Sequence, residues 1–190
     1  EIRQALAHIV DQAQFLTATI GDPAYEKPCV SIMACGSPNE STAGAAPFAK
    51  ADVAKAKDLL KKAGYANEPI VLMDPTDQHI LHQMAVVMGQ LMREAGINVD
   101  LQANDWSAVV TRSTRGDKPC DQELEARKSR FFAAATPAER KAAMDSLQER
   151  FYESMPYVVT GQFLAPKAWR DNVTGVVNAS EFVFWNVEKK

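Results

Sequence analysis

Residues 51–106 contain the pattern that most constrains the fold of this chain: a helix, a strand, a second helix and a second strand, with short connections. ADVAKAKDLLKKAG predicts a helix that Asp52 caps and Gly64 ends. PIVLMDP then predicts a strand, QHILHQMAVVMGQLMREAG a long helix, and INVDLQA a half-buried strand. Strand–helix–strand units close right-handed with parallel strands, so this stretch predicts an α/β fold.

The first of these strands is predicted to be covered on both faces, because Ile70 to Met73 is a continuous apolar run. Thr76 or Asp77 can cap the helix that follows. Four methionines, at positions 73, 84, 88 and 92, fall in or beside this unit. Two interpretations of them stay open, a methionine-rich ligand groove and ordinary core packing.

The flanking regions predict further helices and short strands. Residues 1–16 have the apolar spacing of one helix, and residues 20–50 form a long irregular loop. Helices are expected over 121–133 and from Pro137 to about Ser154, the second with Thr136 as N-cap and Glu139 three residues on. Strands are expected at 157–163, 173–177 and 181–187.

Three cysteines are present. Cys29 and Cys35 flank five residues of the long loop and are either a disulfide, which implies an oxidising compartment, or two small buried thiols. A zinc site is not expected, because no histidine pair lies at zinc-finger spacing. If Cys29 and Cys35 pair with each other, Cys120 is the third and unpaired cysteine of the sequence.

Composition and motifs exclude several classes of function. The net charge of −3 argues against a nucleic-acid binder, and no apolar stretch reaches the roughly 18 residues of a membrane span. The sequence contains no nucleophile elbow, dinucleotide fingerprint or P-loop. His79 and His82 lie three apart on a predicted helix, but no third ligand is near them in sequence. We therefore expect neither enzymatic activity, nor a bound metal, nor a cofactor.

Polar residues follow both predicted parallel strands, where open α/β sheets bind their ligands. Because both carboxyl ends lie on one edge of the sheet, we predict a ligand-binding edge there. Its residues are Asp74, Thr76 and Gln78 after the first strand, and Asn104, Asp105 and Trp106 after the second. A compatible alternative is that Thr76, Asp77 and Asp105 are helix caps and Trp106 fills the core.

Several segments, in this order and spacing, resemble the C-terminal lobe of the family 5 extracellular solute-binding proteins, the peptide- and nickel-type receptors of bacterial ABC importers. They are EIRQALAHIVD, ADVAKAKDLLKKAGY, PIVLMDPTD, MGQLMREAGINVDLQANDW, AERKAAMDSLQERFYESMPYVVTGQF and the closing VTGVVNASEFVFWNV. The resemblance covers nearly all 190 residues. It implies one lobe, residues 1–190, of a type II periplasmic-binding-protein-like fold, with a mixed sheet and flanking helices.

The resemblance also implies a function: capture of a peptide or similar small solute between two lobes, without catalytic residues, and delivery to an ABC permease. It implies a periplasmic or membrane-anchored location, and it strengthens the expectation of a Cys29–Cys35 disulfide. The N-terminal lobe of the family is absent from this sequence, which opens at Glu1 within a helical pattern like an excised or mature fragment. The alternative is a standalone α/β interaction or structural module without a small-molecule ligand.

This sequence departs from the family in a second place. Some forty residues that family members carry are expected to be missing between Lys118 and Asp121. The resemblance would then make Cys120 a half-cystine whose partner lay in that stretch.

Overall fold

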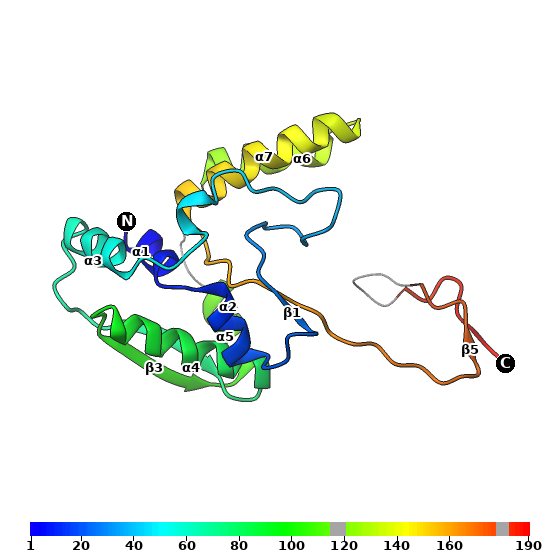
Figure 1. Cartoon of the computed structure of the whole chain (residues 1–190), viewed down its shortest axis with the longest axis horizontal. Helices are drawn as coiled ribbons and strands as arrows, with labels where there is room; N and C mark the ends of the chain where they lie inside the picture. The colour runs from blue at the N-terminus through cyan, green and yellow to red at the C-terminus, as the bar shows by residue number, and fades with distance from the viewer. Residues whose placement is uncertain (115–120, 178–182) are drawn as a thin grey trace.

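The computed structural model describes residues 1–114, 121–177 and 183–190 (Figure 1). The predicted gap between Lys118 and Asp121 and the pairing of Cys120 fall outside these residues. The described part of the chain forms one α/β lobe and a C-terminal arm that projects from it.

The predicted strand–helix–strand unit is present. Strand β2 (Ile70–Pro75) leads into helix α4 (His79–Glu94) and returns as strand β3 (Val99–Asn104). The two strands pair in parallel, with Leu72 opposite Leu101 and Pro75 opposite Asn104. The prediction of parallel strands is confirmed.

Helix α4 covers one face of this strand pair, and the other face is covered only toward the end of β2, where Met73 is half-buried and Pro75 is buried, so the prediction that β2 is covered on both faces holds only in part. Gly89 of α4 lies against the Leu72 and Leu101 side chains, so α4 packs on this face of the strand pair. Side chains alternate along a strand, so Val71 points the other way and is 51% exposed. The continuous apolar run therefore predicts two covered faces correctly at the end of β2 but not at Val71.

Three short helices pack beside this unit: α1 (Ile2–His8), α2 (Gln12–Thr19) and α3 (Val53–Lys62). The single helix predicted for residues 1–16 is broken because Asp11 has an extended backbone and its carboxylate accepts a hydrogen bond from the Gln14 N–H at 3.1 Å, which starts α2. The prediction for α3 is confirmed: Asp52 caps it and Gly64 follows with a positive φ of 73°.

The main core joins these elements. Ala5, Phe15, Leu60, Met92 and Ile97 are buried in one cluster that draws on α1, α2, α3, α4 and the turn before β3. Burial of such apolar surface is the chief force that holds the lobe together.

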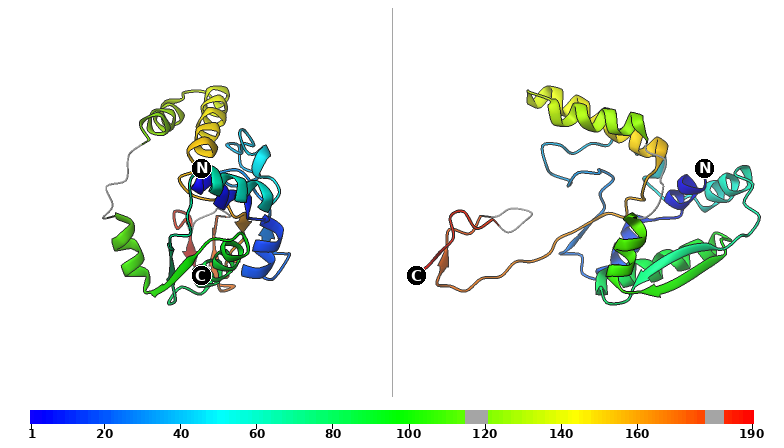
Figure 2. Two further views of the ribbon diagram at one scale, coloured as in Figure 1. Left: turned by 90° about the vertical axis from the view of Figure 1, so that its left-hand side faces the viewer. Right: turned by 180° about the vertical axis from the view of Figure 1, so that it is seen from behind.

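Helices α6 (Gln122–Ala133) and α7 (Pro137–Ser154) form an antiparallel hairpin at the opposite end of the lobe from β2 and β3 (Figures 1 and 2). The predicted capping box at Thr136 and Glu139 is present. Phe131, Met144 and Leu147 make the hairpin's own small core.

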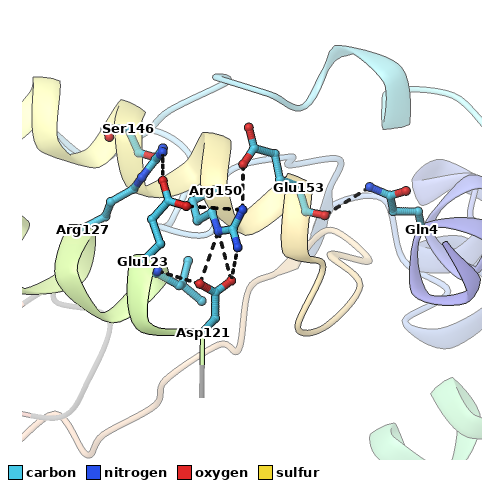
Figure 3. A network of polar contacts seen from close by, with 8 residues as sticks. Gln4, Asp121, Glu123, Arg127, Ser146, Arg150 and Glu153 are labelled. Atoms are coloured by element: carbon cyan, nitrogen blue, oxygen red, sulfur yellow. Dashed lines mark hydrogen bonds and ion pairs between the residues drawn. The ribbon is translucent and has the colours of Figure 1, made fainter. Parts of the chain in front are cut away.

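A polar network fastens the hairpin (Figure 3). The Arg150 guanidinium bonds the Asp121 carboxylate at 3.0 Å and also reaches Glu123 and Glu153. The Glu153 carbonyl accepts a hydrogen bond from Gln4 of α1 at 3.1 Å. The network therefore ties the start of α6 and the end of α7 to each other and to the first helix of the chain.

The long loop between α2 and α3 contains strand β1 (Glu26–Lys27), the 3₁₀ helix η1 (Ala46–Phe48) and the Cys29–Cys35 disulfide. The disulfide interpretation of this pair is thus confirmed. Glutamine side chains hold the loop in place. The Gln12 side chain donates to the Cys29 carbonyl and accepts from the Cys29 N–H, and Gln162 accepts a hydrogen bond from the Cys35 N–H. Further along the loop, the Gln148 amide donates to the Ser41 carbonyl.

After α7 the chain passes along the loop and then leaves the lobe. Strand β4 (Gln162–Phe163) pairs with β1, and beyond it an extended arm ends in a hairpin of β5 (Val173–Thr174) and β6 (Glu188–Lys189) (Figures 1 and 2). Trp185 near the end of the arm is 90% exposed.

The strands predicted for the last third of the chain are much shorter than expected. Only two residues of the predicted strand 157–163 pair with another strand, and only two of the predicted strand 173–177 do so. In the described part of 181–187 no residue pairs, since β6 begins at Glu188. The described residues form three separate two-stranded sheets, two antiparallel and one parallel, in place of one mixed sheet. A strand requires a neighbouring strand for its backbone bonds, and β propensity alone does not supply one.

None of the helices in the described part of the chain combines the length and the apolar character needed to cross a bilayer.

The buried His8 is expected to make the stability of the lobe depend on pH. His8 is 6% exposed, its ring lies 4.6 Å from that of Phe48, and its Nδ1 has no hydrogen-bond partner among the described residues. Burial lowers the pKa of His8 below its usual 6.5, an effect that Asp52 opposes and Lys55 reinforces. As the pH falls below 6.5 the unfolded chain therefore takes up a proton before the folded chain does.

We expect the free energy of unfolding to fall as the pH drops from 6.5 toward the lowered pKa of His8. The His8→Phe variant keeps an aromatic ring against Phe48 but cannot bind a proton, so its stability should stay flat across that window. Urea unfolding at a series of pH values measures this. Hydrogen bonds lower the pKa values of carboxyls such as Asp121 and Glu139. These groups take up protons, and so affect stability, only below about pH 4. Equal slopes for the two proteins between pH 6.5 and 5 would contradict the assignment.

Candidate functional site

The ends of β2 and β3 meet, as the sequence predicts, and bring the candidate residues to one edge of the lobe. Pro75 lies opposite Asn104. The Thr76 N–H donates to the Asn104 carbonyl at 3.0 Å, and the Thr76 hydroxyl donates to the same oxygen at 3.3 Å. Thr76, Gln78 and Asp105 are exposed there, and Asn104 is half-buried with its amide bonded to the Gln102 carbonyl. Their contact with a ligand stays a prediction.

Asp74 differs from the other five because it points inward. It is 4% exposed, and its Oδ1 lies 2.7 Å from Nδ1 of His82 on the first turn of α4. His82 thus gives the buried Asp74 carboxylate a hydrogen-bond partner, and the contact sets the orientation of the imidazole ring. Sequence reasoning assigned His82 only to a possible metal pair. The available signal was a carboxylate at a strand end followed by a histidine one turn into the next helix.

The aspartates at this edge cap α5 (Trp106–Thr114) and not α4. Asp77 accepts a hydrogen bond from the Trp106 N–H at 2.8 Å, and Asp105 accepts from the Ala108 N–H at 2.7 Å. Gln78 occupies the N-cap position of α4 without a side-chain bond, so the prediction that Thr76 or Asp77 caps α4 is wrong. These two caps connect the ends of β2 and β3 to the start of α5.

This edge carries negative charge. The Ser107 hydroxyl and the Ala108 N–H both donate to Asp105, and these bonds lower the pKa of its carboxyl below the usual value, so it is ionised near neutral pH. A helix N-terminus favours a carboxylate in the same way.

Trp106 is 42% exposed, so it does not fill the core as the alternative supposed. It lines a groove of about 330 Å³ between α2, α4, α5, the end of β2 and the segment 158–160. Met73, Met84 and Met88 line the same groove, whereas Met92 is 2% exposed in the core. The four methionines thus divide between the two interpretations that the sequence left open: three line a groove and Met92 packs in the core.

The two histidines do not converge on a metal. His79 Nε2 contacts the Gln83 amide at 3.3 Å, while His82 turns to Asp74. Among residues 1–114, 121–177 and 183–190 no group of three or more histidine, cysteine, aspartate or glutamate side chains could hold a metal ion.

The sequence model of the bacterial extracellular solute-binding proteins, family 5 Middle, matches residues 1–122. The probable peptide ABC transporter periplasmic-binding protein y4tO of Sinorhizobium fredii is 30% identical over 228 aligned positions, which cover 98% of this chain and 43% of that protein. The chain therefore spans less than half the length of this relative.

Solved structures share the fold. The oligopeptide-binding protein AppA of Bacillus subtilis, in complex with a nonapeptide, matches with a TM-score of 0.74 at 14% identity, over 100% of this chain and 47% of that one. The dipeptide-binding protein of Pseudoalteromonas sp. SM9913, in complex with Met-Leu, matches with a TM-score of 0.73 at 20% identity, over 100% of this chain and 45% of that one. These are type II periplasmic-binding-protein-like structures, which confirms the predicted fold class.

Proposed function

Because the chain belongs to the bacterial extracellular solute-binding proteins of family 5, we propose that it is part of the solute-binding component of an ABC import system. It captures peptides or similar small solutes and delivers them to a membrane permease. The observation that carries the proposal is the match of residues 1–122 to the family, together with a peptide-transport relative aligned over 98% of the chain.

Capture takes place between this lobe and a second one. The relatives are about twice as long as this chain, which supports a counterpart lobe outside it. The exposed arm, with Trp169 52% and Trp185 90% exposed, offers apolar surface that such a lobe would cover. Solute favours the closed arrangement because it contacts both lobes only there.

The solute meets this lobe at the edge formed by Thr76, Gln78, Asn104, Asp105 and Trp106, with Asp74 beneath it. The exposure of Thr76, Gln78, Asp105 and Trp106, and the position of all five residues at or just beyond the carboxyl ends of the two strands, support this assignment. The protein acts by binding, without catalysis, cofactor or metal. We place it in the periplasm or outside the cell with a membrane anchor, and the Cys29–Cys35 disulfide supports an oxidising compartment.

The proposal includes a stretch that relatives have and this chain lacks. The alignment with the Sinorhizobium protein extends over 228 positions, although the chain has 190 residues and is 98% covered, so the relative contains internal residues without a counterpart here. We place the gap between Lys118 and Asp121, and Cys120 would have its partner there. The comparisons do not favour the alternative, a standalone module without a small-molecule ligand.

Isothermal titration calorimetry with dipeptides and oligopeptides tests the two-lobe proposal. The 190-residue chain should show no measurable affinity, because about half of the contacts are missing while the cost of ordering the solute remains. A two-lobed protein made by joining this lobe to the N-terminal lobe of a family member should bind. Micromolar binding by the lone chain, or none by the two-lobed protein, would contradict the proposal.

A further inference from the structure

The groove beside Trp106 has a chemistry that selects among solutes. Its walls come from α2, β2, α4, α5 and the segment 158–160, and include Phe15, Met84, Met88, Trp106 and Val109. No charged side chain lines it, and Thr160 is its one polar lining residue within the described part of the chain. A ligand site of this kind holds apolar groups, while a few polar atoms at its mouth fix their orientation.

The size of the groove limits what it can take. At about 330 Å³ it lies at the lower end of ligand-pocket volumes, which run from roughly 300 to 1,000 Å³. One aliphatic or aromatic side chain fits this space better than a whole peptide does. The unbranched methionine side chains can adjust to either shape, and the indole ring offers a flat surface for stacking.

The charges around the groove further restrict the occupant. Trp106 and Pro75 belong both to the groove and to the strand edge, so the groove is continuous with that edge. Asp77 and Asp105 cap the helix that starts at Trp106, and the nearby Asp74 carboxylate is paired with His82. An acidic group placed in the groove would lose its hydration and lie beside these carboxylates, both of which are unfavourable.

We propose that the groove between α2, α4, α5, the end of β2 and the segment 158–160 is a side-chain subsite that receives an uncharged aliphatic or aromatic side chain of the captured solute and rejects acidic ones. The inference rests on the proposed function and narrows its substrate class. Met73, Met84 and Met88 determine the specificity, and Trp106 forms the wall nearest the binding edge.

Methionine methyl NMR of the 190-residue chain tests the subsite directly, because it detects weak binding. The probes are N-acetyl-phenylalanine amide and N-acetyl-leucine amide, with N-acetyl-serine amide and N-acetyl-aspartate amide as matched polar and acidic controls. The methyl signals of Met73, Met84 and Met88 should shift with the apolar probes, whereas those of the buried Met92, Met144 and Met155 should stay. The apolar probes should bind about tenfold more tightly than the controls.

A pair of variants on one helix supplies the second readout. Met88→Gln keeps the volume but adds a polar amide to the groove, and should weaken binding of the apolar probes about tenfold. Val86→Gln changes an exposed residue of α4 outside the groove and should leave binding unchanged. Thermal unfolding of both variants checks that each is folded before binding is compared.

The outcomes separate the subsite from the proposed function. If no probe shifts the three methyls, or serine and aspartate probes shift them equally, the subsite is overturned, and another segment or a protein surface covers the groove. If the two-lobed protein binds peptides without a preference for apolar side chains, the subsite is overturned and the function stands. If apolar probes shift the methyls but the two-lobed protein captures no peptide or other solute, the proposed function fails, and with it the assignment of the groove to a captured solute.

Discussion

Replacing Gln148 by leucine should lower the free energy of unfolding by about 3 kcal/mol. Gln148 is 0% exposed and lies in the middle of α7, where its amide faces the long loop. It accepts a hydrogen bond from the Ile32 N–H at 3.1 Å and donates to the Ser41 carbonyl at 2.6 Å. Leucine fills a similar volume but leaves these backbone groups unpaired, and each buried group without a partner costs about 1–3 kcal/mol.

The matched control is Gln90→Leu on α4. Gln90 is exposed and bonds only Glu94 of the same helix in the described structure, so its loss should change stability by less than about 0.5 kcal/mol. Urea unfolding monitored by circular dichroism compares the two variants with the parent. Equal stability of the two would mean that Gln148 does not hold the loop against α7.

Removing the disulfide should cost about 2 kcal/mol and loosen the segment through which the chain leaves the lobe. The bond closes a short loop, with a sequence separation of 6 between Cys29 and Cys35, so the loss of chain entropy in the unfolded state is modest. The structural consequence is larger, because Gln12 bridges the Cys29 and Val159 carbonyls, and Gln162 holds the Cys35 N–H at 2.8 Å. The loop therefore anchors residues 159–162.

Hydrogen exchange measured by mass spectrometry on the Cys29→Ser/Cys35→Ser variant checks this. Exchange should speed up in residues 157–164 and stay unchanged in β2 and β3, which pair with each other and pack against α4. A Cys120→Ser parent removes the third thiol from both proteins and serves as the control. Unchanged exchange at 157–164 together with unchanged stability would show that the disulfide does not anchor the outgoing segment.

Sequence reasoning predicted well those elements whose signals lie within a few residues. Asp52 and Gly64 bound α3 because a cap and a left-handed glycine act on adjacent backbone groups. The capping box of Thr136 and Glu139 is local in the same sense. The parallel pairing of β2 and β3 follows from the handedness of the crossover and needs no further information.

Predictions failed where a distant residue decided the outcome. Asp77 caps α5, which starts 29 residues later, because parallel pairing brings the two strand ends together. The strand predicted at 157–163 pairs over only two residues, since β1 offers an edge of just that length. Val71 is exposed although its neighbours are apolar, because α4 covers one face of the pair.

The amino-acid sequence alone was enough to predict the start and end of α3, the capped start of α7, the parallel pairing of β2 and β3, and the cluster of six polar or aromatic residues at and just beyond the carboxyl ends of these strands. Caps, glycines and side-chain periodicity act over one or two turns of chain, and the sequence contains them in full. Three features follow from the folded arrangement alone: Asp74 turns inward to His82, Asp77 caps α5, and Trp106 shares a groove with three methionines. A hydrogen-bond donor or an apolar surface takes whichever partner the folded chain brings within reach, and separation in sequence does not specify that partner.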